Sequence, residues 1–114
     1  MLYKIGTLSE LPSLPFTLPE PAHTELVRVL AVLDSEYGKA RDYSKDGGYV
    51  LIAETADDLP ALRTIIDYEA HPCEWATRHG SFLSALYVLT NDYAITVFMP
   101  LSAAPKAILE DLEG

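Results

Sequence analysis

The alternation of apolar and polar positions is clearest between Cys73 and Met99, where three apolar runs are separated by two short polar breaks. The runs are rich in β-branched and aromatic residues, and the breaks contain Gly, Asn and Asp. This combination predicts three antiparallel strands joined by tight turns. We expect the turns at His79-Gly80 and Asn91-Asp92, a register that places Trp75 opposite Ser84.

Alternate residues of a strand point to opposite faces of a sheet, so this register divides the segment into two faces. One face is expected to be the core and collects Cys73, Trp75, Phe82, Leu86, Val88, Tyr93, Ile95, Val97 and Met99. The other face has an apolar centre formed by Leu83, Tyr87, Leu89 and Phe98. Because a solvated face is normally more polar, this patch is either covered by a helix or an exposed interface. A register slip of one residue would exchange the two faces.

The remaining segments predict further elements, each from its own local pattern. A helix is expected from Thr24 to about Tyr37, and two more after the capping residues at 55–58 and after Ser102. The last of these is expected to continue to Leu112. Tyr49–Glu54 is almost entirely apolar and predicts a strand buried on both sides. Residues 1–5 suit a short edge strand, whereas four prolines in residues 6–21 are expected to exclude a helix there.

These elements predict an α+β fold in one domain of residues 1–114, with a Pro-rich N-terminal arm over 1–21 and an α+β core over 22–114. The expected sheet is mixed and four-stranded. It combines one β-α-β crossover, which makes strand 49–54 parallel to the strand near Cys73, with the three-stranded antiparallel meander. The helices are expected mainly on one face of this sheet.

The composition limits the class of protein. Hydrophobic residues make up 49% of the 114 residues and the formal net charge is −9, which favours an ordered globular chain and argues against direct binding of nucleic acid or anionic membranes. No uncharged apolar run approaches the ~18–20 residues that span a bilayer, and the N-terminus lacks a secretory pattern. A single cysteine excludes an intrachain disulfide. We therefore expect a cytoplasmic protein.

The best candidates for chemistry are Cys73 and its two flanking histidines, His71 and His79. A thiol beside an imidazole can form a nucleophile or supply two metal ligands. The alternative, which we favour, is a buried structural cysteine, because the strand pattern places Cys73 on the apolar face. No familiar catalytic or phosphate-binding motif is present, so an enzyme is the less favoured class, and we expect no cofactor and no metal.

Three short strings carry a resemblance. They are Leu33-Asp34-Ser35-Glu36-Tyr37-Gly38, Asp46-Gly47-Gly48-Tyr49-Val50 and Asn91-Asp92-Tyr93-Ala94-Ile95. Over about residues 25–112 the chain resembles small acidic bacterial proteins that are uncharacterised accessory products of conjugative or integrative elements. The resemblance implies a non-enzymatic accessory role in the cytoplasm, and it carries over no catalytic or binding residue.

The leading functional hypothesis is a protein-interaction module, with a protein partner or a homodimer formed through the patch of Leu83, Tyr87, Leu89 and Phe98. A second hypothesis is an acidic nucleic-acid mimic that inhibits a DNA-binding protein. It requires acids spread along one surface: Glu54, Asp57, Asp58, Asp67, Glu69, Glu74, Asp92, Glu110 and Asp111. A third is a small enzyme or metal site that uses Cys73 with His71 or His79.

Overall fold

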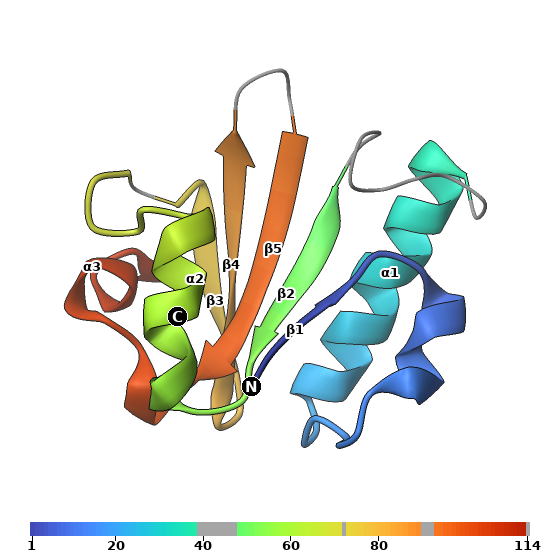
Figure 1. The fold of residues 1–114 in the computed structure, drawn as a ribbon, viewed down its shortest axis with the longest axis horizontal. Coiled ribbons are helices and arrows are strands. Elements are labelled where there is room, and N and C mark those ends of the chain that lie inside the picture. Colours follow the sequence, from blue (N-terminus) through green and yellow to red (C-terminus); the bar gives the residue numbers. More distant parts are fainter. Residues whose placement is uncertain (39–47, 72, 90–92, 114) are drawn as a thin grey trace.

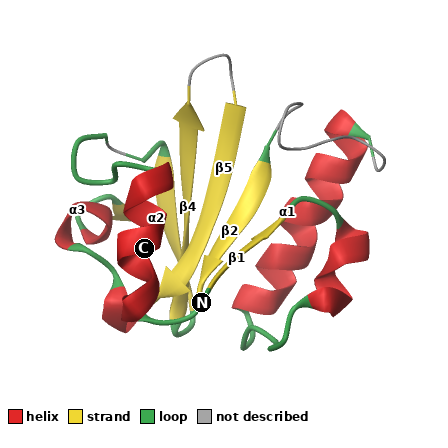
Figure 2. Ribbon diagram, in the orientation of Figure 1, coloured by secondary structure: helices red, strands yellow, loops and turns green. Residues whose placement is uncertain are grey.

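The computed structural model describes residues 1–38, 48–71, 73–89 and 93–113. A mixed sheet forms the centre, in the order β1-β2-β5-β4-β3, and a two-residue strand, β6, extends it beside β3 (Figures 1 and 2). The strands are β1 (Leu2–Ile5), β2 (Tyr49–Ala53), β3 (Trp75–His79), β4 (Phe82–Leu89), β5 (Tyr93–Pro100) and β6 (Leu112–Glu113). The α-helices are α1 (Ala22–Tyr37), α2 (Leu59–Ile65) and α3 (Lys106–Leu109).

The α+β class and the antiparallel meander β3-β4-β5 are confirmed, but the sheet is larger than the predicted four strands. β1 adds an edge strand antiparallel to β2. The parallel neighbour of β2 is β5, so β2 and β3 run in the same direction without being adjacent. The crossover through α2 therefore spans the space that β4 and β5 fill.

The register differs from the prediction at both ends of β4. His79 lies opposite Phe82, so Gly80-Ser81 occupies the tip of the first turn, and Gly80 has a φ of 67°, which glycine adopts readily. This shift of two residues keeps the same faces together and places Trp75 opposite Leu86. The second register is shifted by one residue, so Leu86 lies opposite Thr96 and not Val97. The predicted turn at Asn91-Asp92 lies outside the described residues.

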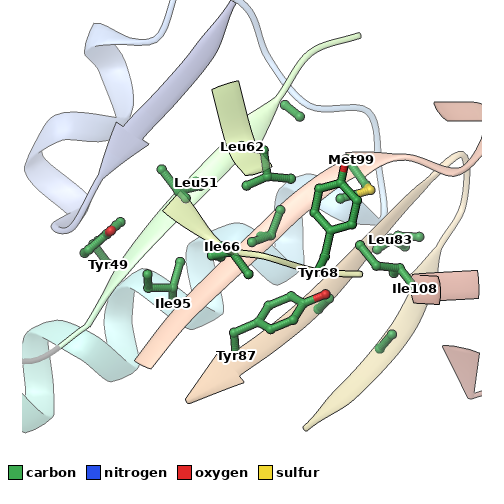
Figure 3. Close-up of a cluster of buried hydrophobic side chains, with 14 residues drawn as sticks. Tyr49, Leu51, Leu62, Ile66, Tyr68, Leu83, Tyr87, Ile95, Met99 and Ile108 are labelled. Carbon is green, nitrogen blue, oxygen red and sulfur yellow. The ribbon is translucent and has the colours of Figure 1, made fainter. Parts of the chain in front are cut away.

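The one-residue shift splits the predicted core face between the two sides of the sheet. Ile95, Val97 and Met99 belong to one side, which we name the α2 face, where they pack with Leu62 of α2 and Ile108 of α3. Figure 3 shows this cluster, with Leu83 and Tyr87 among its buried side chains. The prediction of an exposed patch at Leu83 and Tyr87 is therefore wrong.

The opposite side of the sheet, which we name the α1 face, carries a second core. Phe98 is fully buried there with Leu26 and Leu30 of α1, so it is not an interface residue either. The side chain of Leu89, the fourth member of the predicted patch, lies outside the described residues. Helices thus pack on both faces of the sheet and not mainly on one (Figure 1). Trp75, Phe82 and Leu86, predicted to be core, are only partly buried on the α1 face.

The N-terminal arm includes a 3-10 helix, η1 (Leu8–Ser13), which contradicts the expectation that its prolines exclude a helix. Pro12 lies inside this single short element, where few amide donors are needed. α1 begins at Ala22, two residues before the predicted start at Thr24, and ends as predicted at Gly38, whose φ is 90°.

The predicted capping signal after β2 is confirmed. Thr55 and Asp58 form a reciprocal capping box around the 3-10 turn η2 (Ala56–Asp58) that leads into α2. Asp58 accepts hydrogen bonds from the amides of Glu54 and Thr55 at 2.7 and 3.0 Å. Its Oδ1 lies 2.7 Å from the N-terminal ammonium of Met1. Burial alone would raise the pKa of this carboxyl, but the hydrogen bonds outweigh it and lower the pKa below its ordinary 3.8.

The predicted last helix is wrong in extent. Ser102 lies in a 3-10 turn, η4 (Leu101–Ala103), α3 is a single turn capped by Pro105, and Leu112 belongs to β6. In the described part of the chain, no helix has both the length and the apolar character required to cross a bilayer.

Candidate functional site

The structure separates the residues of the predicted thiol site. Cys73 packs against the core of the α2 face, His71 is exposed, and His79 lies on the α1 face. Burial, together with a hydrogen bond from Sγ to Oδ2 of Asp111 at 3.5 Å, raises the pKa of Cys73 to about 11. A thiol held in its protonated form is a poor nucleophile and a poor metal ligand. Within the described residues, no three His, Cys, Asp or Glu side chains are grouped so that they could hold a metal ion.

The strongest surface feature is a groove on the α1 face. α1 passes over this face diagonally: its N-terminus lies beside the β3-β4 turn, where a Cβ on Gly80 would meet Cδ of Pro21 at 2.9 Å. Its C-terminal half lies beside the start of β2, because Gly48 is close to both Leu33 and Ala94. The sheet beside that half of α1 is only partly covered, because Val88 is exposed and Trp75 and Leu86 are partly buried.

The space between this part of the sheet and α1 is a cavity of about 240 Å³. Its floor consists of side chains from β3, β4 and β5, and its wall is a stripe of α1 in which the lining residues recur at intervals of four. The floor residues are Trp75, Leu86, Ala94 and Thr96; the wall residues are Arg28, Val29, Val32, Leu33, Glu36 and Tyr37. We refer to these ten residues as the α1 groove.

Exposed apolar side chains concentrate at this groove. Val32 is 41% exposed and Tyr37 is 40% exposed. Val88, which is 46% exposed, lies opposite Ala94 and beyond Leu86 on the same face of β4. These are three of the six large apolar residues that are exposed in the described part of the chain. Isolated exposed apolar residues are ordinary, whereas a contiguous group beside a groove marks a binding surface.

A polar cluster lies at the N-terminal end of the groove wall. The Nε2 atom of His79 lies 2.8 Å from the hydroxyl of Ser84 and 3.7 Å from Oε2 of Glu25. The other oxygen of Glu25 accepts a hydrogen bond from Nε of Arg28. An acid-histidine-serine relay needs the acid and the hydroxyl on different ring nitrogens, but here both are closest to Nε2. The cluster therefore joins α1 to the β3-β4 hairpin and does not form a catalytic triad.

A second hollow, of about 210 Å³, lies between the N-terminal arm and the start of α1. Its walls include Leu14, Phe16, His23 and Leu26. The Nδ1 atom of His23 is buried and has no hydrogen-bond partner among the described residues. This hollow gathers none of the exposed apolar side chains that distinguish the α1 groove.

The acids required by the nucleic-acid mimic are largely engaged within the chain. Asp58 is buried, Asp111 contacts Cys73, and Glu69 pairs with Arg63 at 2.9 Å. Asp92 lies outside the described residues. Carboxylates that are buried or paired are poor substitutes for a row of solvated phosphates, so the geometry favours the α1 groove over this hypothesis.

The α1 groove was missed because the sequence analysis predicted a helix from Thr24 to about Tyr37 without assigning its apolar residues to separate faces. A second stripe at 28/29, 32/33 and 36/37 was readable from the sequence as a helical repeat of four residues. The floor could not be found, since Trp75 and Leu86 were assigned to the core.

Comparisons with models of protein families, with curated proteins and with solved structures found no match for this chain.

Proposed function

We propose that this protein is a non-enzymatic interaction module that binds a segment of a partner protein in the α1 groove. The observation that carries the proposal is the gathering of Val32, Tyr37 and Val88 around a groove with a partly exposed tryptophan in its floor. Aromatic residues set in an apolar groove are characteristic anchors of protein interfaces. The polar groups near the groove are joined to one another and offer no arrangement for chemistry.

Site-specific photocrosslinking tests this proposal directly. A benzophenone amino acid would replace Val32 or Val88 in the protein expressed in cells that naturally produce it. The matched control is Leu109 in α3, which is 42% exposed but lies on the other side of the sheet. We expect one discrete cross-linked partner from Val32 in the groove wall and from Val88 beside the groove, and none from the control position. Absence of a groove-specific product, or the same products from Leu109, would contradict the proposed function.

The accessory role in a conjugative or integrative element stays a prediction from the sequence. The same cross-linking product would test it, because mass spectrometry identifies the partner. A partner from the transfer or integration machinery supports that role. A partner from general metabolism would contradict it while leaving the interaction function intact.

A further inference from the structure

We infer that the occupant of the α1 groove is an amphipathic α-helix with a cationic flank, contributed by a partner protein. This inference rests on the proposed function and specifies the chemistry of the partner. Three properties of the groove lead to it: the pairing of the strands in its floor, its dimensions, and the charges on its wall.

β4 and β5, the central strands of the floor, cannot pair with an extended peptide, and β6 occupies the outer edge of β3 at Ala76 and Thr77. β4 is bonded on both sides, to β3 and β5, and β5 is bonded to β4 and β2. A strand-like peptide lying on this face would leave its own amides and carbonyls without partners once water is excluded. A helix satisfies its backbone internally and presents only side chains, so it is the regular structure that can lie on this floor.

The dimensions also suit a helix. β3, β4 and β5 span two strand spacings of ~4.8 Å, or about 10 Å, which matches the ~10 Å diameter of a helix. The wall stripe runs over residues 28–37 of α1, a length of about 14 Å at 1.5 Å per residue. A partner helix of about three turns can therefore lie beside α1 at the usual separation of ~8–10 Å.

The charges at the groove indicate which side chains the flank of the partner helix carries. Glu36 is exposed in the groove wall, and the chain carries a net charge of −9. The one cation of the wall, Arg28, already bonds to Glu25. Lysine or arginine on the partner would complement this rim and be steered toward it. A second copy of the chain is disfavoured, because it would bring Glu36 and a second charge of −9 against the same acids.

Defined peptides test the inference. The first is an uncapped Leu/Lys peptide of about 14 residues with helical periodicity, without tryptophan. The second replaces each Lys by Glu, and the third has the composition of the first in strict alternation, which favours a strand. Binding is followed by the fluorescence of Trp75, the single tryptophan of the chain, and by the circular dichroism of the peptide.

We expect saturable binding of the cationic helical peptide, with a change in Trp75 emission and a gain of helix, about tenfold or more tighter than either control peptide. Val88→Lys should weaken it about tenfold, whereas Leu109→Lys, an identical change of charge at an equally exposed position, should not. Equal weakening by both variants would show non-specific attraction and overturn the inference. So would equal binding of the anionic or alternating peptide, or no binding of the cationic helix.

The interaction function and the cationic-helix inference can be refuted independently of each other. A groove-specific cross-link to a segment that is anionic or extended would overturn the cationic helix while the interaction function stands. A dimer in sedimentation velocity that Val88→Lys dissociates and Leu109→Lys does not would assign the groove to a second copy, and would also overturn the inference.

Discussion

Replacing Phe98 by Ala tests the face assignment on which the α1 groove depends. Phe98 is completely buried between the sheet and α1, in a cluster with Leu26, Leu30 and Ile52, its neighbour on β2. Under the hypothesis of an exposed patch, the same ring would project into solvent. The buried and the exposed placement of Phe98 therefore give opposite results for this substitution.

The expected loss follows from the burial. Removing a fully buried aromatic side chain forfeits ~2–3 kcal/mol of transfer free energy. A residual cavity of about 50–80 Å³ adds ~1–2 kcal/mol at ~24 cal/mol per Å³. The sum, ~3–5 kcal/mol, is a large part of the roughly 6–17 kcal/mol that a chain of this length has at ~0.05–0.15 kcal/mol per residue. The variant should fold at low temperature and be markedly less stable.

Urea unfolding followed by far-ultraviolet circular dichroism measures this loss. We expect a lower midpoint with an unchanged m-value, because the surface exposed on unfolding is the same. Val88→Ala is the control: Val88 is 46% exposed on the same face, and its truncation should change stability by no more than ~0.5 kcal/mol. A loss below ~1 kcal/mol for Phe98→Ala would refute the face assignment, because that is the range of exposed positions.

Three further predictions concern buried polar groups. Cys73, with a pKa of about 11, should react with iodoacetamide at pH 7.5 roughly 100-fold more slowly in the folded protein than in urea; equal rates by mass spectrometry would contradict this. Tyr87→Phe should leave the free energy of unfolding unchanged or raise it by up to ~1 kcal/mol, because the buried hydroxyl has no hydrogen-bond partner among the described residues; a loss above ~1 kcal/mol in urea unfolding would reveal a missed partner. Asp58 has a lowered pKa, so its contribution is present above about pH 4 and is lost as the pH falls through the folded value. Asp58→Asn should therefore be ~1–2 kcal/mol less stable at pH 7, and this gap should close in unfolding curves below about pH 4; a gap that widens in acid would contradict the direction of the shift.

Local chemistry explains which parts of the fold could be predicted. Gly38 ends α1, and Thr55 with Asp58 starts the turn into α2, because these residues satisfy backbone groups within a few positions of themselves. The fully buried run of β2 was recognisable because a strand covered on both sides shows no alternation. Each of these features depends on a short stretch of sequence and little else.

The register of the meander could not be predicted in the same way. Leu89 pairs with Tyr93, so three residues separate the paired positions where a two-residue turn was expected. Alternation normally corrects such an error, but β4 and β5 carry large apolar side chains on both faces, since helices cover both. Leu83 and Leu86 are equally credible core residues from sequence. The choice between them depends on α1 and α2, which are distant in the chain.

The apolar residues at the α1 groove could serve either the core or a partner. α1 is about 10 Å wide, while the five main strands span about 19 Å, so a single helix must leave part of this face open. An open sheet face ordinarily carries polar residues, which cost little at half-exposed positions. The chain instead places Val88 on the open part of the sheet and Val32 on α1 beside it. Their apolar character is therefore not a requirement of folding, and a double change to Thr separates folding from binding.

We expect Val32→Thr with Val88→Thr to keep the unfolding free energy within ~0.5–1 kcal/mol while the partner cross-linked from Tyr37, the third exposed groove residue, is lost. A stability loss of several kcal/mol with the cross-link retained would show that these side chains serve the core and not a partner.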